Sequence, residues 1–315
     1  MNQSSGSGFA VADVTPPAPK VRLGLVADVQ HADKENGGCD GRSQFYRSAP
    51  EKLARAIDAF LENKVSGVLN LGDSIDGNVD EISTAQDLER VATQFDRLGA
   101  QGLPAHHVLG NHCLSLRRDE FQNRVGMPAS YYSVQLAEDW KLVVCDTNDL
   151  AVHGWDEGTP ERRRAESYLE AHPATERDPH MTGWNGGIGD DQLAWLEAQL
   201  AEAQSVVLAT HHPIHGARST HLAWNYRSIR ALVAKYRGVV KLALAGHDHV
   251  GGYGVFDGVH FVTLEAILET PTDAYAFLDI YDDRIDIRGV GTATSRTIPL
   301  VTVTTAALEA AAAAA

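Results

Sequence analysis

Two histidines separated by one residue follow an apolar run in the segment LALAGHDHVGGYG, residues 242–254. In an extended chain, side chains two residues apart point to the same side, so His247 and His249 can reach one site. Neutral imidazole is the commonest metal ligand among side chains. A single histidine at a strand end is more often a hydrogen-bonded structural residue. The pair therefore predicts a metal site only if other strand ends supply further ligands.

Four other apolar runs also end in residues that carry ligand oxygens or nitrogens. In open α/β sheets, ligands bind outside the carboxyl ends of the strands. One GD or GNH sequence alone would say little, but five strand ends that all deliver such residues indicate one site. The residues after these four runs are Asp28 and Gln30 in VADVQ, Asp73 in NLGDS, Asn111 and His112 in VLGNHC, and His211, His212 and His215 in LATHHPIH.

The elements that must position these residues alternate between strands and helices. The spacing of apolar residues predicts helices over 49–64 and 190–203. Strands that alternate with helices favour parallel pairing in a layered α/β fold. The expected strands are VRLGLVA from residue 21, VSGVLNL from 65, AHHVLG from 105, KLVVCD from 141, SVVLAT from 205 and VVKLALAG from 239.

The pattern changes in two regions. After residue 250, the runs VHFVTLEAI, AYAFLDIY and DRIDIRGV follow one another without a helical pattern, which predicts an antiparallel sheet that closes the domain. Residues 153–187 are long, polar and rich in glycine and proline. A loop of that length in a compact domain is usually functional.

The charge balance excludes some classes of protein. Lysine and arginine number 27 against 42 aspartates and glutamates, a formal net charge of −15. This balance argues against a nucleic-acid-binding protein, which would show a basic stripe. An acidic chain can still bind an anionic substrate if a bound cation reverses the local charge. No run of 18 apolar residues occurs, so we expect no membrane span, and no feature indicates a protein partner.

The cysteines and the chain ends bear on location and boundaries. The three cysteines, at 39, 113 and 145, are odd in number and widely spaced, so neither a disulfide framework nor a cysteine zinc site is expected. A reducing, cytoplasmic location fits this usage. Residues 1–20 lack the apolar core of a signal peptide and are expected to be flexible. We expect one domain over 21–300 and interpret AALEAAAAAA, residues 306–315, as an expression-tag remnant rather than a natural alanine-rich helix.

The order D-x-Q, GD, GNH, HH, GHxH resembles the calcineurin-like metallophosphoesterase superfamily. A closer resemblance is to the manganese-dependent ADP-ribose/CDP-alcohol diphosphatases. It rests on Gln30 in place of the usual histidine, on GWNGGIGDDQLAWL (183–196), and on WNYRSIRALV and AGHDHVGGYGVFDGVHFVTLEAILETPTDAYAF within 224–277. The resemblance extends from about residue 21 to about residue 298. It implies an α/β fold, a four-layer α-β-β-α metallophosphoesterase sandwich with two mixed β-sheets and a dinuclear metal site at the C-terminal ends of strands.

The resemblance also implies two divalent metal ions and their ligands. Asp73 would bridge the ions, because two metals about 3.5–4 Å apart share an anion, and together they would activate a bridging water for in-line attack on phosphorus. The oxygen-rich set favours Mn²⁺, with Mg²⁺, Fe or Zn²⁺ as alternatives. The alternative for Gln30 is a hydrogen bond to a bound water. The first ion would be held by Asp28, Gln30, Asp73 and His249, and the second by Asp73, Asn111, His211 and His247.

His112 is the expected catalytic residue. In the superfamily, the histidine at this position lies near the leaving oxygen, as an acid or a charge stabiliser. Most relatives in the family carry an acidic residue next, whereas this chain has Cys113, and a thiol orients a histidine poorly. Asp119 or Glu120 are alternatives for the acidic partner. Cys113 itself is interpreted as an inert buried residue rather than a redox switch.

Substrate contacts are expected from four regions of the chain. Arginine and tyrosine side chains can bind phosphate and stack on a base, although the GRSQFYR segment can equally be an ordinary helix entry. His212 is the one histidine of its group expected to be structural. The expected substrate-binding residues are Arg42, Tyr46, Arg47, Trp184, Asn185, His215 and Tyr253.

The resemblance implies a hydrolase that splits the diphosphate of nucleoside diphosphate conjugates. ADP-ribose and CDP-alcohols such as CDP-glycerol would yield a nucleoside monophosphate and a phosphorylated product. Two alternatives stay open: a phosphomonoesterase or cyclic-nucleotide phosphodiesterase that uses the same metals, and a scaffold of the same fold without catalysis.

Overall fold

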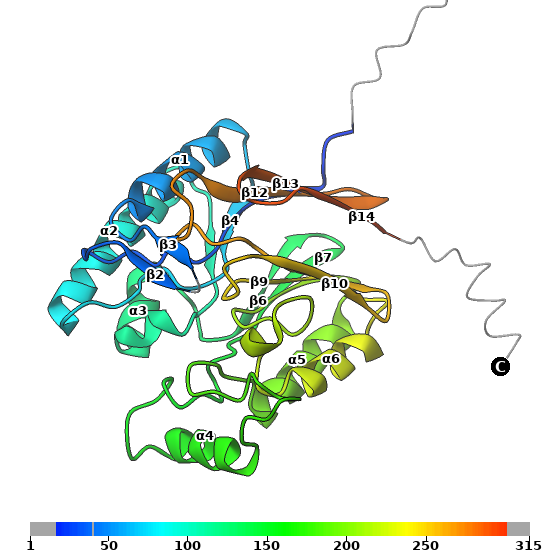
Figure 1. Cartoon of the computed structure of the whole chain (residues 1–315). Helices are drawn as coiled ribbons and strands as arrows, with labels where there is room; N and C mark the ends of the chain where they lie inside the picture. Colours follow the sequence, from blue (N-terminus) through cyan, green and yellow to red (C-terminus); the bar gives the residue numbers. More distant parts are fainter. Residues whose placement is uncertain (1–16, 40, 301–315) are drawn as a thin grey trace, which may run out of the picture.

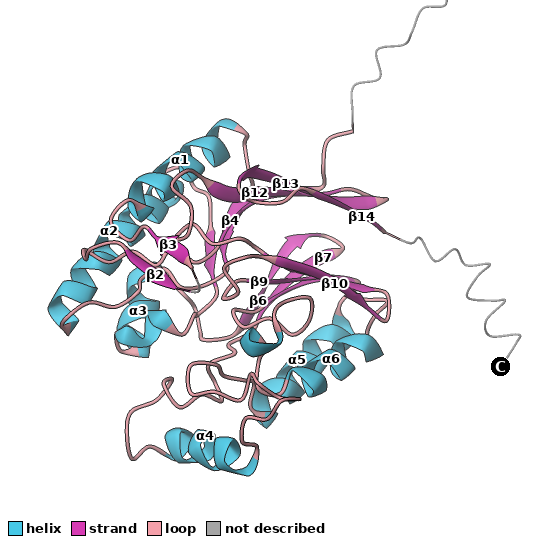
Figure 2. Ribbon diagram, viewed as in Figure 1, coloured by secondary structure: helices cyan, strands magenta, loops and turns pink. Residues whose placement is uncertain are grey.

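The computed structural model describes residues 17–39 and 41–300. Two β-sheets lie face to face, and helices cover the outer face of each sheet (Figures 1 and 2). The expected four-layer α-β-β-α sandwich with two mixed sheets is therefore confirmed. The tag-like segment 306–315 and all but the last four of residues 1–20 lie outside the described residues.

The first sheet has its N-terminal strands in one half and its C-terminal strands in the other half. β1, β4 and β5 pair in parallel, and the other three strands pair antiparallel. Helices α1 (Ala49–Glu62) and α2 (Glu81–Gly99) cover its outer face. The strand order is β14 (Arg296–Pro299), β13 (Arg284–Gly291), β12 (Ala274–Ile280), β1 (Val21–Val26), β4 (Gly67–Asn70) and β5 (Ala105–His107).

The second sheet has four parallel strands with one antiparallel strand at each edge. Helices α5 (Asp190–Glu202) and α6 (Tyr226–Lys235) cover its outer face. The strand order is β10 (Gly252–Phe256), β11 (Val259–Thr263), β9 (Val240–Ala245), β8 (Ser205–Ala209), β7 (Trp140–Val144) and β6 (Tyr132–Ala137).

Shorter elements lie around the ends of the sheets. They are the hairpin β2 (Gly37–Cys39) and β3 (Arg42–Gln44), the 3-10 helices η1 (His112–Ser115) and η2 (Ser219–His221), and the helices α3 (Arg118–Val125) and α4 (Pro160–Ala171).

Alternation along the strands builds two kinds of core. Leu23 and Leu25 of β1 belong to the core between the sheets, where they join Leu142 and other strand residues of the second sheet. Val26 and Phe60 belong to the core between the first sheet and its helices. Successive strand residues face opposite sides of a sheet, so one set of apolar side chains packs between the two sheets. The strand ends of both sheets therefore lie along one shared edge.

Two expectations were wrong in part. The strands after residue 250 do not form a separate antiparallel sheet: β11 pairs in parallel with β9, and β12 crosses to the first sheet, antiparallel to β1. The segment 153–187 is not all loop, because it contains α4. Thr159 caps this helix by accepting from the backbone N–H of Arg162, and Pro160 occupies its first turn.

Among the described residues, no helix is long and apolar enough to cross a bilayer. Cys113 and Cys145 are buried free thiols.

Candidate metal centre

The predicted ligands come from the carboxyl ends of strands in both sheets. Asp28 follows β1, Asp73 follows β4 and Asn111 follows β5, whereas His211 follows β8 and His247 follows β9. They meet at one open cavity of about 690 Å³. The residues that line it are Gln30, Arg42, Gln44, Tyr46, Asp73, Asp76, Asn111, His112, Trp184, Arg218, Thr220, His221, His247, His249 and Glu269.

The backbone at these strand ends is unusual. Six non-glycine residues of the described chain have positive φ, a conformation that costs on the order of 1 kcal/mol or more and often marks functional sites. Four of the six are predicted metal ligands, Asp28 (φ 49°), Gln30 (41°), Asp73 (50°) and His247 (68°).

Asp73 is the point where the two predicted ligand groups meet. The ligand atoms of Asp73, His211 and His247 all lie within 4.8 Å of one another, and all three residues are buried. His211 Nε2 is 3.2 Å from Asp73 Oδ2 and 3.1 Å from Asn111 Oδ1. This is the cluster predicted for the second ion.

The residues predicted for the first ion lie close to Asp73 or to Asp28. Gln30 Nε2 is 3.5 Å from Asp73 Oδ2, and His249 Nε2 is 3.7 Å from Asp28 Oδ1. Asp28 also accepts the backbone N–H of His247, 3.0 Å from its Oδ1. The structure thus brings all seven predicted ligands together.

Two glycines allow this convergence. A Cβ atom at Gly110 would lie 2.1 Å from Asp73 Oδ1, and one at Gly72 would lie 2.4 Å from His211 Nδ1. Real Cβ atoms do not approach other heavy atoms so closely. The glycines of the GD and GNH sequences are therefore required by the packing of the ligand side chains.

Burial and mutual charge perturb the acids and bases of the cluster. Burial raises the pKa of Asp28 to about 6, although His249 and His211 oppose the shift. Burial disfavours the charged forms of Asp73 and His211 as well, but their attraction outweighs it. The pKa of Asp73 is lowered, and that of His211 is raised to about 9. Buried carboxylates need a nearby positive charge, which protonated His211 supplies here.

Groups outside the cluster fix the orientation of two ligand histidines. His211 Nδ1 donates to the Leu71 carbonyl at 2.9 Å, and His249 Nδ1 donates to Glu269 Oε1 at 2.8 Å. Both rings therefore present Nε2 to the cluster. Glu269 also pairs with Arg42. Glu269 was not predicted from the sequence, although it lies in the LEAILETP segment on which the resemblance depends.

A buried lysine holds the segment that carries Glu269. Lys52 Nζ donates to the carbonyl oxygens of Ile267 and Thr270, at 2.6 and 2.9 Å. Its side chain is only 2 % exposed. Glu269 lies between these two carbonyls in the chain, so Lys52 stabilises the partner of a predicted ligand from the outer layer of the fold.

His112 lines the cavity and has an acidic partner that sequence reasoning did not find. His112 Nδ1 is 3.0 Å from the Asp76 carbonyl and 3.2 Å from Asp76 Oδ1. Both oxygens are acceptors, so Nδ1 carries the proton toward Asp76 and Nε2 faces away from it. Asp119, an alternative considered for this role, is exposed and pairs with Arg117. Burial raises the pKa of the Cys113 thiol to about 12, in keeping with an inert role.

The predicted substrate-binding residues separate into two groups. Arg42, Tyr46 and Trp184 line the cavity, and Asn185 lies buried directly behind it. The other three are elsewhere: Arg47 pairs with Asp33 and Glu35, His215 contacts Arg230, and Tyr253 on β10 bonds His260 on β11.

Another wall of the cavity is formed by residues that were not predicted from the sequence. They are Arg218, Thr220 and His221, which come from the loop around η2. Arg218 Nε donates to Asp248 Oδ1 at 2.8 Å. Asp248 is the residue between the paired histidines, so this wall is attached to the ligand motif itself. His212 is buried and bonds Thr147, as expected of a structural residue.

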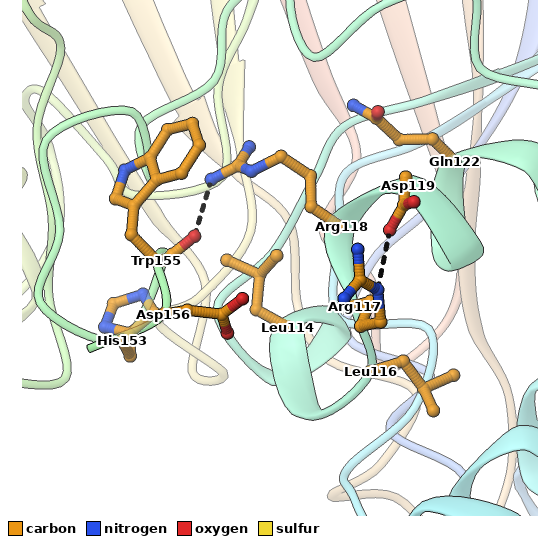
Figure 3. A pocket seen from close by; sticks show the side chains of 10 residues that line it. Leu114, Leu116, Arg117, Arg118, Asp119, Gln122, His153, Trp155 and Asp156 are labelled. Carbon is orange, nitrogen blue, oxygen red and sulfur yellow. Dashed lines mark hydrogen bonds and ion pairs between the residues drawn. The ribbon is translucent and has the colours of Figure 1, made fainter. Parts of the chain in front are cut away.

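A second, smaller cavity of about 320 Å³ lies between α3 and the segment before α4 (Figure 3). Its principal cation, Arg118, pairs with Asp146, bonds the Asn148 and Gly154 carbonyls, and stacks on Trp155 with Cζ 4.4 Å from the ring centre. None of the predicted site residues lines this cavity. We therefore assign the chemistry to the larger cavity.

Comparison with known proteins agrees with this geometry. Residues 21–251 match the calcineurin-like phosphoesterase family. The chain is 32 % identical to a manganese-dependent ADP-ribose/CDP-alcohol diphosphatase of Oryza sativa subsp. japonica, over 86 % of this chain and 91 % of that protein. The protein of the same name from Homo sapiens is 32 % identical, over 85 % of this chain and 90 % of its own.

A solved structure shows the same fold. The crystal structure of a dimetal phosphatase from Danio rerio superposes with a TM-score of 0.82 and 29 % identity, and the match covers 89 % of this chain and 99 % of that one.

Proposed function

The chain belongs to the calcineurin-like phosphoesterase family, and from that membership and the geometry of its cavity we propose that it is a manganese-dependent diphosphatase of nucleoside diphosphate conjugates. As a member of this family, it is a hydrolase of phosphate esters. The proposed substrates are ADP-ribose and CDP-alcohols such as CDP-glycerol. The products are a nucleoside monophosphate and a phosphorylated remainder.

The observation that carries the proposal is the position of Asp73. Its buried carboxylate contacts groups that come from both sheets: Oδ2 is 3.2 Å from His211 Nε2 and 3.5 Å from Gln30 Nε2. A carboxylate that contacts members of both predicted ligand groups is placed to bridge a pair of divalent cations. The relatives named for ADP-ribose and CDP-alcohol cleavage support the narrower substrate class.

The chemistry of the donor set fits two divalent cations. Gln30 Oε1 is buried without a hydrogen-bond partner in the described structure, as is appropriate for an oxygen that binds a cation. Carboxylate and amide oxygens beside imidazoles suit Mn²⁺ better than a soft metal. When bound, such ions polarise phosphoryl oxygens and lower the pKa of water. They would be held by Asp28, Gln30, Asp73, Asn111, His211, His247 and His249.

The chain's own groups supply orientation and a proton. Asp76 holds the proton of His112 on Nδ1 and orients the ring, so that Nε2 can serve the leaving oxygen in the cavity. Arg42 and Arg218 both line the cavity, and their guanidinium groups can bind the oxygens of a diphosphate. Trp184, which is 41 % exposed at the rim, offers a face on which a base or a sugar can pack.

A substrate panel tests the proposal. ADP-ribose, CDP-glycerol, 2′,3′-cyclic AMP and p-nitrophenyl phosphate would each be offered to the purified protein with Mn²⁺ or Mg²⁺, and the products would be identified by chromatography. We expect AMP from ADP-ribose and CMP from CDP-glycerol, with higher kcat/KM than for the other two compounds. A preference for the cyclic nucleotide would instead indicate a cyclic-nucleotide phosphodiesterase, and a preference for the monoester would indicate a phosphomonoesterase. Absence of bound metal would support a scaffold.

A further inference from the structure

Asn185 has a place in the structure that differs from its expected role as a substrate contact. It follows the exposed Trp184 in the GWNGG segment, yet its own side chain is fully buried. Its Oδ1 atom is 2.8 Å from Nε2 of His247, a predicted ligand of the second ion. The contact joins the segment before α5 to the loop after β9, 62 residues further along the chain.

The other end of the Asn185 amide determines which atom faces His247. Nδ2 lies 2.8 Å from the carbonyl oxygen of His180 and 2.8 Å from that of Thr220. Carbonyl oxygens only accept, so the amide must present its two N–H groups to them. A flipped amide would set its oxygen against two other oxygens. The orientation of the side chain is thus forced by its neighbours.

The fixed orientation of the Asn185 amide determines the tautomer of His247. Because Oδ1 of Asn185 only accepts, His247 must carry its proton on Nε2. A neutral imidazole has one such proton, and its other nitrogen then has a free lone pair. The lone pair on Nδ1 of His247 is therefore the one left for a metal, and a nitrogen of this ring lies within 4.8 Å of the ligand atoms of Asp73 and His211. His211 and His249 present Nε2, because backbone and carboxylate acceptors hold their Nδ1 protons.

We infer that Asn185 is a positioning residue that fixes the tautomer of His247 and thereby controls binding of the second metal ion. The inference rests on the proposed function only in that the cluster binds metal. Loss of a hydrogen-bonding partner of a metal ligand typically weakens metal binding by about 10- to 100-fold. The effect is expected at one of the two ions, because the other ligand histidines depend on different acceptors.

The test compares two substitutions at Asn185 with one at a matched amide. Asn185→Leu removes the acceptor for His247, whereas Asn185→Asp keeps an acceptor there but loses the donors to His180 and Thr220. Asn225→Leu is the control. Asn225 is another asparagine that holds the same segment, through hydrogen bonds to the backbone N–H and carbonyl of Ile188, and it makes no hydrogen bond to His247 in the described part of the chain.

Two readouts apart from catalysis decide the result. Long-range ¹⁵N–¹H spectra of the metal-free protein, with the His247 signals assigned by their loss in His247→Asn, report the tautomer. Electron paramagnetic resonance of free Mn²⁺ reports the affinity of each ion. We expect an Nε2–H tautomer in the wild type. We also expect about 10- to 100-fold weaker binding of one ion in Asn185→Leu and near-normal binding in Asn225→Leu. Asn185→Asp should lose less affinity than Asn185→Leu, because it keeps the acceptor for His247, but more than Asn225→Leu, because its second oxygen faces the carbonyls of His180 and Thr220.

Several results would overturn the inference. An Nδ1–H tautomer of His247 in the wild type would do so even where a variant fails to fold. Unchanged affinity for both ions in Asn185→Leu would also do so, as would an equal loss in Asn225→Leu. Failure of the proposed function is a separate result, since a protein that binds two ions but leaves ADP-ribose intact retains this role for Asn185.

Discussion

Asp73 accepts the backbone N–H of His112, 2.9 Å from its Oδ1 atom, so the predicted bridging ligand also fixes the start of the segment that carries the predicted acid. The other carboxylate oxygen, Oδ2, faces His211 and Gln30. One buried side chain thus sets the distance between the metal cluster and His112. Substitutions at these two positions are expected to separate metal binding from proton transfer.

His112→Ala is expected to leave metal binding intact and to slow the reaction. Loss of a general acid typically costs about 10²–10⁴ in rate. The loss should be large for ADP-ribose and small for p-nitrophenyl phosphate, because p-nitrophenolate leaves without a proton. Steady-state rates on both substrates measure the difference, with His172→Ala, an exposed histidine at the end of α4, as the control. Equal losses on both substrates would exclude an acid role for His112.

Asp73→Asn is expected to remove both ions and nearly all activity. The amide has almost the shape of the carboxylate but lacks its charge, and it cannot bridge two cations well. Metal content after dialysis, measured by mass spectrometry, should fall from two ions per chain to fewer than one. Retention of two ions would show that Asp73 does not bridge.

Chelation of the metal is expected to abolish activity and to lower the thermal stability of the wild-type protein. A ligand that binds only the folded state raises its free energy of unfolding, and the buried carboxylates Asp28 and Asp73 have most to gain from added positive charge. Activity and melting temperature should recover best with Mn²⁺. Full activity in excess EDTA would contradict a metal-dependent mechanism.

Gln30→His is expected to retain metal binding and to change the metal preference. Imidazole is softer than an amide oxygen, so the ratio of activities with Zn²⁺ and Mn²⁺ should rise. Gln30→Ala should weaken one ion only. Activity titrations with each metal measure both effects. If neither variant changes the metal profile, Gln30 is not a ligand.

The ligand cluster could be predicted from the sequence because each ligand follows its own strand within a few residues. The short motifs GD, GNH and GHDH carry both the side chain and the glycine that lets it approach its neighbours. In a layered α/β fold the strand ends must meet, so the local motifs were sufficient. The alternation of strands and helices predicted a layered α/β fold, and the resemblance supplied the two sheets and the four layers.

The partners of the ligands could not be predicted, because they come from distant parts of the chain. Asp76 reaches His112 across 36 residues, and Glu269 reaches His249 across 20. Neither contact has a local signature. His215 was expected at the substrate because it is close in sequence to His211, but the chain turns after β8 and places it against Phe261. Helix α4 was missed because its residues are mostly polar and exposed, although Thr159 and Pro160 were a usable signal for its start.

Lys52 makes a prediction about alkaline pH. Burial lowers its pKa to about 8 in the folded protein, against an ordinary value of 10.5. Between these two values the unfolded chain binds more protons than the folded one, so the free energy of unfolding should rise with pH in this range. Below about pH 8 the lysine is charged in both the folded and the unfolded state, so it does not make the free energy of unfolding depend on pH. Across this pH range the free energy of unfolding should rise by roughly 3 kcal/mol through Lys52 alone.

Urea denaturation of the wild type and of Lys52→Met, from pH 7 to pH 10.5, measures this contribution. Methionine fills a similar volume and cannot titrate, but it cannot donate to the Ile267 and Thr270 carbonyls. We therefore expect the variant to be less stable than the wild type at pH 10, where the neutral amine still donates, and the gap to narrow toward pH 7. Because the same carbonyls flank Glu269, the variant should also bind Mn²⁺ more weakly. A gap that stays constant across this range would show that Lys52 keeps an ordinary pKa.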